Sequence, residues 1–482
     1  MRKMYTEETL WSTPKKEIKI LKSRHELSYV LPGLIHILEE RRDIIEQVHK
    51  DLTAGKSNKK GREGMPAVMA LTLLVVRNTI QGNYAELEWM LHNDKTLLAL
   101  LGDNPINPIK LYDEKTIHQN LNKISFATIE AINNAVIKSA QKEGFEKGGN
   151  IRGDSFVCKR NIHTPSESTL LYDCARVIIR NCEKIDTSII GRQEEHHLRK
   201  IKATVREIGG LRRSKRSKEK KEKEMQKAHA ILIGQIKTII KRVKKNAEIA
   251  REILEILADK KDIVPTKYIV ISTTTIMAEA IIELTKRRVL LNEEIPNREK
   301  ILSIFETEVE LINRGKYPIA IEFGHKIFVH QSESGFIVDW AIMGAGKKDS
   351  EQIEPSIERI KKNYGIEFNC GSYDKGFHTP ENQKELPKLF LAKKVVIPKK
   401  GKRTEAETER EHTKDFIKLK FFRAGVESLI SSLVRGNGMG LCPDRGMSNY
   451  KKYTACCILS RNLHTLGNYL IERENAVNKK AG

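Results

Sequence analysis

The apolar residues of 318–343 recur at every second position, whereas those before this stretch follow a helical spacing. Successive side chains of a strand point to opposite faces, so a period of two predicts β-strands. Ile327 and Val329 belong to one such run, and residues 336–338 form another after the turn-forming sequence 332–335. This order predicts a β-hairpin, so part of the chain must form a sheet.

Helical and strand patterns alternate after the hairpin. The spacing predicts a helix at 351–364, a strand at 366–373, a helix at 380–390 and a strand at 394–398. A further strand is predicted at 150–159, directly after Gly148 and Gly149. This alternation favours strands joined by crossover helices, so the predicted fold class is α/β with a mixed sheet.

The other regions have helical patterns. Residues 1–149 are predicted to form an all-helical N-terminal domain, with helices at 25–51, 66–80 and 83–92. The short turn between the last two suits either a helix-turn-helix that binds DNA or a plain helical packing unit. Residues 165–315 are predicted to be a basic helical insertion after the first strand, and helices are also predicted at 416–433 and 453–466.

The insertion contains a charged segment, 212–224, with eight basic and three acidic residues. Apolar residues then recur at steps of three and four from Leu232 to Leu257, which predicts a long amphipathic helix. A basic run of this kind forms either a solvated surface or a track for a phosphate backbone, and both interpretations stay open.

The 482 residues include 86 Lys and Arg against 63 Asp and Glu, a formal net charge of +23. Such a balance indicates a polyanionic partner. No uninterrupted apolar run reaches the ~18 residues of a membrane span, and residues 1–8 lack the apolar core of a signal peptide, so we expect a cytoplasmic protein without a membrane partner. Seven cysteines without a C-x-x-C pair indicate neither a disulfide framework nor a cysteine zinc site.

Three acidic residues occupy positions that suggest a functional site. Asp154 lies inside the strand predicted at 150–159, and Asp374 directly follows the strand predicted at 366–373. The carboxyl ends of neighbouring strands bring such distant residues together. Glu427 lies on the polar stripe of a helix, with Arg423 one turn before it. The alternative is that Arg423 and Glu427 form a surface ion pair and that each Asp only caps an element.

Three converging carboxylates suit two Mg²⁺ ions, with Mn²⁺ as a substitute, because Mg²⁺ prefers hard oxygen ligands. Two such ions catalyse in-line displacement at phosphorus by water or a 3′-hydroxyl. A competing interpretation starts from Gly153-Asp154-Ser155, which matches the G-D-S start of some serine esterases. No clear Asp and His follow to complete a triad, and an esterase for small neutral esters does not need a charge of +23.

Four segments carry a resemblance to a known family: Gly153-Asp154-Ser155 with Asn161-Ile162-His163-Thr164-Pro165, residues 300–329 with Glu322-Phe323-Gly324-His325-Lys326, Tyr373-Asp374-Lys375-Gly376-Phe377-His378, and Phe422-Arg423-Ala424-Gly425-Val426-Glu427. The chain resembles the DDE transposases of bacterial insertion sequences, in particular the heterogeneous group labelled ISNCY. The likeness covers Ile151 to the C-terminus, and the N-terminal helices more loosely.

The resemblance implies an RNase H-like fold, with a catalytic core of 150–164 and 316–475. It gives Asp154, Asp374 and Glu427 the roles of catalytic metal ligands. Nucleic-acid contacts are implied for four basic residues: Lys375, Lys420, Arg423 and Arg435. The larger set of insertion-sequence enzymes shows Y-x2-R-x3-E-x6-K, whereas this chain has Lys420 at the Tyr position and Val434 at the Lys position.

The implied function is that of a DNA transposase that binds the inverted repeats of its own element, cleaves phosphodiesters and joins the 3′-hydroxyls to target DNA. Double-stranded DNA is the expected partner, and synapsis of two ends implies a homodimer. Two alternatives stay open. One is a catalytically inactive basic DNA-binding protein derived from a transposase, and the other is an RNase H-like nuclease without strand transfer.

Overall fold

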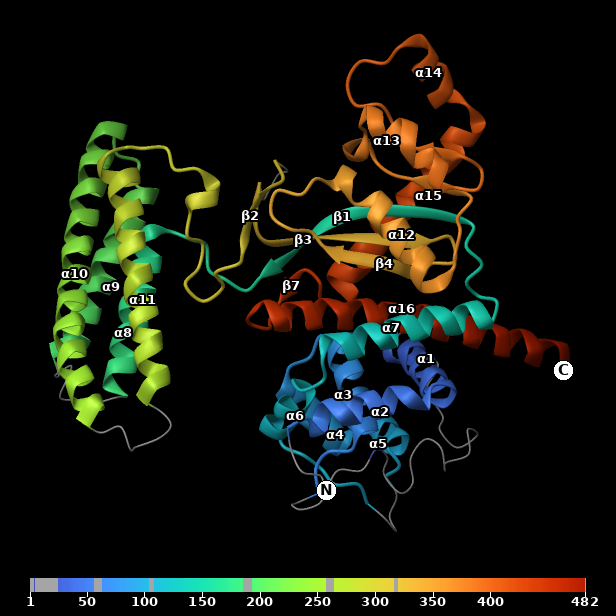
Figure 1. Ribbon diagram of the computed structural model, residues 1–482, viewed down its shortest axis with the longest axis horizontal. Coiled ribbons are helices and arrows are strands. Elements are labelled where there is room, and N and C mark those ends of the chain that lie inside the picture. The colour runs from blue at the N-terminus through green and yellow to red at the C-terminus, as the bar shows by residue number, and fades with distance from the viewer. Residues whose placement is uncertain are drawn as a thin grey trace. The chain divides into compact units, whose positions relative to one another are not determined.

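The computed structural model describes Met4 and residues 25–55, 63–103, 108–184, 193–256, 264–315 and 320–481. The chain forms two compact units. We call residues 1–161 with 324–482 the sheet unit and residues 162–323 the helical unit. Figure 1 labels the elements of each.

A mixed sheet is the framework of the sheet unit. Within the described residues its strand order is β2-β3-β1-β5-β6, with β4 paired to β3 and β7 paired to β1. The strands are β1 (Asn150–Arg160), β2 (Glu310–Asn313), β3 (Ile321–Ser332), β4 (Ile337–Ile342), β5 (Cys370–Ser372), β6 (Lys394–Val396) and β7 (Leu441–Cys442). β2 and the first three residues of β3 fall within 162–323, the range of the helical unit, and the other strands belong to the sheet unit. β1 is antiparallel to β3 and parallel to β5 and β7. The predicted α/β class with a mixed sheet is confirmed.

The edge of β1 that faces β5 is only partly paired. β5 aligns with the start of β1, where Arg152 lies opposite Ser372, and β7 aligns with its end, where Lys159 lies opposite Leu441. No described strand pairs with residues 153–158 on this edge. The opening lies beyond the carboxyl end of β5, the kind of position where α/β sheets bind ligands.

Each face of the sheet is covered by helices. On one face, Phe328 of β3 belongs to a hydrophobic cluster with Ile353 and Ile357 of α12 (Ile353–Tyr364). On the other face, Phe156 of β1 packs in a second cluster with Val426 of α15 (Lys414–Ser431) and Tyr450 of α16 (Met447–Ala481). The alternation of side chains along β1 and β3 produces these two cores.

The predicted elements around the sheet are present with shifted limits. The hairpin is β3 and β4, which pair antiparallel. The strand predicted at 366–373 is shorter and comprises only β5. The helix predicted at 380–390 divides into α13 (Pro380–Glu385) and a 3₁₀ turn, Leu386–Leu389. Pro387 has no backbone N–H and so does not extend the α-helical pattern. A short helix, α14 (Glu405–His412), precedes α15.

Seven helices lie within 1–149 in the described residues: α1 (Leu27–Glu40), α2 (Arg42–Thr53), α3 (Ala67–Ile80), α4 (Tyr84–Asn93), α5 (Lys95–Leu100), α6 (Glu114–Leu121) and α7 (Phe126–Lys142). The helices predicted at 66–80 and 83–92 are confirmed as α3 and α4. The single helix predicted at 25–51 is wrong, because the backbone leaves helical geometry at Arg41 (φ −127°, ψ 74°).

The N-terminal helices share one hydrophobic cluster with the sheet, so the structure does not set 1–149 apart as a compact unit. α3 is buried on all sides from Ala67 to Thr79. α4 follows it after Gln81, and Trp89 of α4 is 64% exposed. The burial of α3 fits a packing role for that helix, while α4 keeps an exposed face.

The helical unit contains α8 (Glu167–Glu183), α9 (Gln193–Arg213), α10 (Lys218–Ile256) and α11 (Val264–Thr285), which Figure 1 shows side by side. Its core joins residues from all four helices, among them Leu232, Ile236, Ile239 and Val243 of α10. The predicted amphipathic helix is therefore present, and side chains beyond Lys245 in α10 lie outside the described part. The unit extends over 162–323, close to the predicted insertion of 165–315.

One described helix, Lys267–Leu290, is long and apolar enough to cross a membrane by length and composition. The sequence search for an uninterrupted apolar run missed it, because serine and threonine occupy 272–275. Its apolar window is 39% buried, and Ile271, Ala278 and Ile281 belong to the core of the helical unit. Packing among the four helices accounts for these apolar positions.

Candidate functional site

Asp154 and Asp374 lie together at the partly paired edge of β1. Arg152 lies opposite Ser372, the last residue of β5, and Asp154 and Asp374 each follow this pair by two residues along the chain. Burial, followed by the nearby Asp374 carboxylate, raises the pKa of Asp154 from 3.8 to about 6, although the Ser155 N–H and Arg423 act in the opposite direction. Two acidic residues from distant parts of the sequence are thus close enough to interact.

Each aspartate also makes a local hydrogen bond. Asp154 Oδ1 accepts the Ser155 backbone N–H at 2.7 Å. Asp374 has an extended backbone and caps a 3₁₀ turn, Lys375–Phe377, by accepting the Gly376 N–H at 2.6 Å. Asp374 therefore has the capping role that was the alternative interpretation. The same hydrogen bond fixes its carboxylate just after the carboxyl end of β5.

Arg423 joins the helix α15 to Asp154. Its Nη2 lies 2.7 Å from Glu427 Oε1, and its Nη1 lies 3.5 Å from Asp154 Oδ2. The guanidinium group therefore lies between the two carboxylates. Arg423 is 19% exposed, whereas Glu427 is 67% exposed. The predicted ion pair of α15 exists, and it forms at the aspartate site.

Arg152, which the sequence analysis did not select, holds α15 against the sheet. Its Nη1 donates to the Phe422 carbonyl at 2.8 Å, and its guanidinium stacks over the Phe422 ring at 4.7 Å. Ser372 at the end of β5 donates through Oγ to the Leu419 carbonyl at 2.8 Å. A charged residue inside a strand pattern was the available signal for Arg152, as it was for Asp154.

A further acidic residue, Asp349, was also missed. It lies in a 3₁₀ turn, Asp349–Glu351, after β4, where no periodic pattern marks it. Its Oδ1 accepts the Ser155 hydroxyl at 2.6 Å, and its carboxylate raises the pKa of Asp154 by less than burial and Asp374 do. The site thus holds more negative charge than the sequence predicted.

The remaining predicted nucleic-acid contacts are exposed. Lys375 directly follows Asp374, and Lys420 lies on α15 one turn before Arg423. Arg435 lies in a π-helical turn, Ser432–Gly436, whose Arg435 carbonyl accepts the Gln81 side chain at 2.7 Å. All three side chains are available to a solvent-borne partner.

The described residues contain no group of three or more His, Cys, Asp or Glu side chains arranged to hold a metal ion. Mg²⁺ is, however, commonly bound through one or two carboxylates together with water and substrate phosphates. Asp154 and Asp374 are hard oxygen donors that repel each other. The pair offers the two carboxylates that such an ion commonly takes, whereas Glu427, the third predicted donor, is engaged by Arg423.

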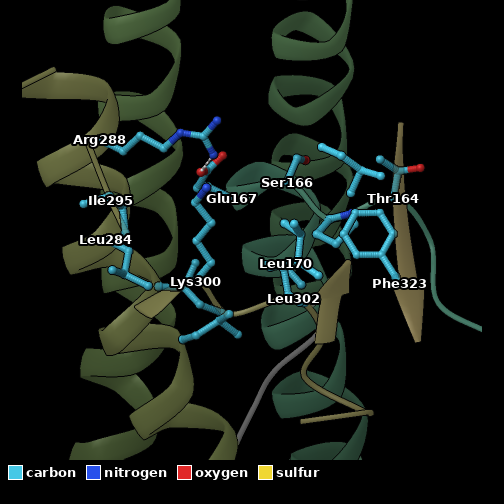
Figure 2. A pocket seen from close by; sticks show the side chains of 15 residues that line it. Thr164, Ser166, Glu167, Leu170, Leu284, Arg288, Ile295, Lys300, Leu302 and Phe323 are labelled. Atoms are coloured by element: carbon cyan, nitrogen blue, oxygen red, sulfur yellow. Dashed lines mark hydrogen bonds and ion pairs between the residues drawn. The ribbon is translucent and has the colours of Figure 1, made fainter. Parts of the chain in front are cut away.

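A cavity of about 300 Å³ lies in the helical unit, and none of the predicted site residues lines it. Figure 2 shows the ion pair of Arg288 with Glu167 at one end and apolar side chains such as Leu170, Leu284 and Leu302 around the rest. Its lining contains a single carboxylate, that of Glu167, which is paired with Arg288. The acidic site of the sheet unit is therefore the candidate functional site.

Comparisons with known proteins do not add a relative: no family model, curated protein or solved structure matches the chain.

Proposed function

We propose that the chain is a DNA transposase of an insertion sequence, which binds terminal inverted repeats and catalyses metal-dependent phosphodiester cleavage and strand transfer. One observation carries the proposal. Asp154 and Asp374 converge at the partly paired edge of β1, and α15 brings Arg423 and Glu427 over the same point. The three acidic residues are the ones that the resemblance assigns to catalysis.

The architecture supports an RNase H-like core as part of this proposal. β1 lies centrally in a mixed sheet, with an antiparallel neighbour on one side and parallel neighbours on the other. The helical unit is inserted between β1 and the rest of β3, where the resemblance implies an insertion. α15, which carries Glu427, comes after β6 along the chain.

Divalent ions, when bound, would supply an activated water or 3′-hydroxyl and stabilise the leaving 3′-oxygen. Asp154, Asp374 and Glu427 would hold them. In the present arrangement Arg423 supplies positive charge to two of these carboxylates. Its planar set of N–H donors also suits a phosphate, so Arg423 would orient the DNA backbone when the carboxylates bind metal.

The proposed partner is double-stranded DNA, at the transposon ends and at the target, bound by a homodimer in the cytoplasm. The charge of +23 favours binding to a polyanion. Lys375, Lys420 and Arg435 are exposed in the same unit as the acidic site, where they would contact phosphates.

The Arg423–Glu427 ion pair favours a second candidate, a catalytically inactive basic DNA-binding protein derived from a transposase. In such a protein the ion pair would be permanent and the carboxylates would not bind metal. An RNase H-like nuclease is the third possibility, and it would cleave DNA without joining ends.

The test is incubation of the protein with its flanking genomic DNA and Mg²⁺, followed by mapping of nicks and joined products. Asp154→Asn and Glu427→Gln should each abolish cleavage and leave salt-sensitive DNA binding nearly intact. Asp415→Asn, on the same helix but 74% exposed and paired with Lys394, is the matched control and should cleave normally. Full cleavage by either site variant would refute the assignment, and nicks without joined products would identify a nuclease.

A further inference from the structure

A lysine–carboxylate pair adjoins the acidic site on the side away from α15. Ser155 follows Asp154 and therefore projects from the other face of β1. Its hydroxyl donates to Asp349 Oδ1 at 2.6 Å. The Lys326 Nζ of β3 lies 3.0 Å from Asp349 Oδ2 and 3.3 Å from Oδ1. Asp349 is therefore linked both to the residue after Asp154 and to a single ammonium group.

The turn that carries Asp349 is tied to the turn that follows Asp374. Asn382 Nδ2 donates to the Ser350 carbonyl and to the Phe377 carbonyl, each at 2.9 Å. Both turns therefore keep a fixed position next to the carboxyl end of β5. The Lys326–Asp349 pair is part of the same framework as the two aspartates, and it has no part in the chemistry proposed above.

Charge is what this pair contributes. Lys326 is 32% exposed and Asp349 is 27% exposed, so the pair is partly shielded from solvent. While both residues are charged, the Lys326 ammonium offsets part of the effect of the Asp349 carboxylate on a nearby cation. Loss of either partner leaves one uncompensated charge within a few ångströms of Ser155, and interactions of partly buried charges over such distances amount to ~1 kcal/mol or more.

We propose that the Lys326–Asp349 pair, linked to β1 through Ser155, sets the affinity of the Asp154–Asp374 site for a divalent cation. Lys326 and Asp349 are positioning residues in this account, because they act through the charge and placement of Asp154. The inference rests on the proposed function, since it requires Asp154 and Asp374 to bind metal. A purely structural role for the pair is the alternative that the experiment must separate.

The experiment titrates the full-length protein with Mn²⁺ and measures free Mn²⁺ by electron paramagnetic resonance. Asp349→Asn leaves the Lys326 ammonium uncompensated and should raise the half-saturating Mn²⁺ concentration at least about threefold. Lys326→Met leaves the Asp349 carboxylate uncompensated and should lower that concentration by a similar factor. The double variant should return to within about twofold of the wild type, because two opposite charges are removed together.

The controls distinguish the possible failures. Lys361 forms an exposed ion pair with Glu367 elsewhere in the sheet unit, so Lys361→Met should leave Mn²⁺ binding unchanged. A structural role would lower the melting temperature of both single variants without opposite changes in affinity, and that result would overturn the inference. Wild-type protein that binds no Mn²⁺, or Mn²⁺ binding that survives in Asp154→Asn, would overturn the proposed metal site and the inference with it.

Discussion

Gly425 of α15 lies directly against the guanidinium group of Arg152 on β1. A Cβ atom at residue 425 would overlap Nη1 of Arg152, which also donates to the Phe422 carbonyl. The helix that carries Arg423 and Glu427 therefore reaches its distance from β1 only because residue 425 has no side chain. This contact lies between Arg423 and Glu427 on the same helix.

Gly425→Ala should destabilise the sheet unit by about 1–3 kcal/mol, the usual cost of overpacking. Arg152 cannot easily withdraw, because Gln331 and the Phe422 ring also hold it. Urea unfolding followed by tryptophan fluorescence measures the effect, since Trp89 and Trp340 are in the sheet unit and the sequence of the helical unit contains no tryptophan.

Gly210→Ala is the matched control for this substitution. Gly210 is exposed on α9, and a Cβ there would meet no atom within 4 Å. Alanine should therefore be neutral or add about 1 kcal/mol to the helical unit, with no change in the tryptophan transition. Unaltered stability in Gly425→Ala would show that α15 can move without cost.

Asp154→Asn should make the protein more stable at neutral pH. The pKa of Asp154 is about 6 in the folded protein against an ordinary value of 3.8, so the folded protein binds the proton more tightly than the unfolded chain does. The contribution of Asp154 to the free energy of unfolding is therefore present at low pH and is lost as the pH rises from about 4 to about 6.

At pH 7.5 the variant should exceed the wild type by about 1–3 kcal/mol in free energy of unfolding, and the difference should vanish near pH 4. Urea unfolding at both pH values measures it. A variant that is less stable than wild type at pH 7.5 would mean that Arg423 compensates Asp154 fully.

Arg423→Gln should separate metal binding from DNA cleavage. Removal of the guanidinium group frees Glu427 and Asp154 from their cationic neighbour, so the half-saturating Mn²⁺ concentration should fall several-fold. Cleavage should nevertheless fall, because a phosphate contact is lost. Arg423→Lys retains the charge, so its Mn²⁺ affinity and its rate of DNA cleavage should both lie between those of the wild type and of Arg423→Gln. Weaker Mn²⁺ binding in Arg423→Gln would contradict the competition between arginine and metal.

The exposed basic residues should contribute through phosphates and not through base sequence. Lys375→Ala, Lys420→Ala and Arg435→Ala should each weaken binding to DNA of any sequence and reduce the slope of log K against log salt by about 0.9. Fluorescence anisotropy at several salt concentrations gives these slopes. Lys362→Ala on α12 removes an exposed lysine that is not one of the predicted contacts and should leave the slope unchanged. Equal slopes for all four variants would leave the three predicted contacts without support.

The sequence by itself determined the local elements that carry the site. A period of two identified β1 and the hairpin of β3 and β4, and helical spacing identified α12 and α15, because these patterns depend only on residues close together in the chain. Asp154 and Asp374 could be selected for the same reason, since a charged residue in or just after an apolar strand is visible in one segment at a time.

Only the tertiary structure decided which residues meet. The register of β1 with β5 brings Asp374 to Asp154, and the contact of Arg152 with Gly425 places Arg423 between two carboxylates. Asp349 gave no local signal, because it lies in a turn after β4 and its role depends on its contacts with Ser155 and Lys326. Strand register and helix placement depend on packing across the whole unit, and no single stretch of sequence encodes them.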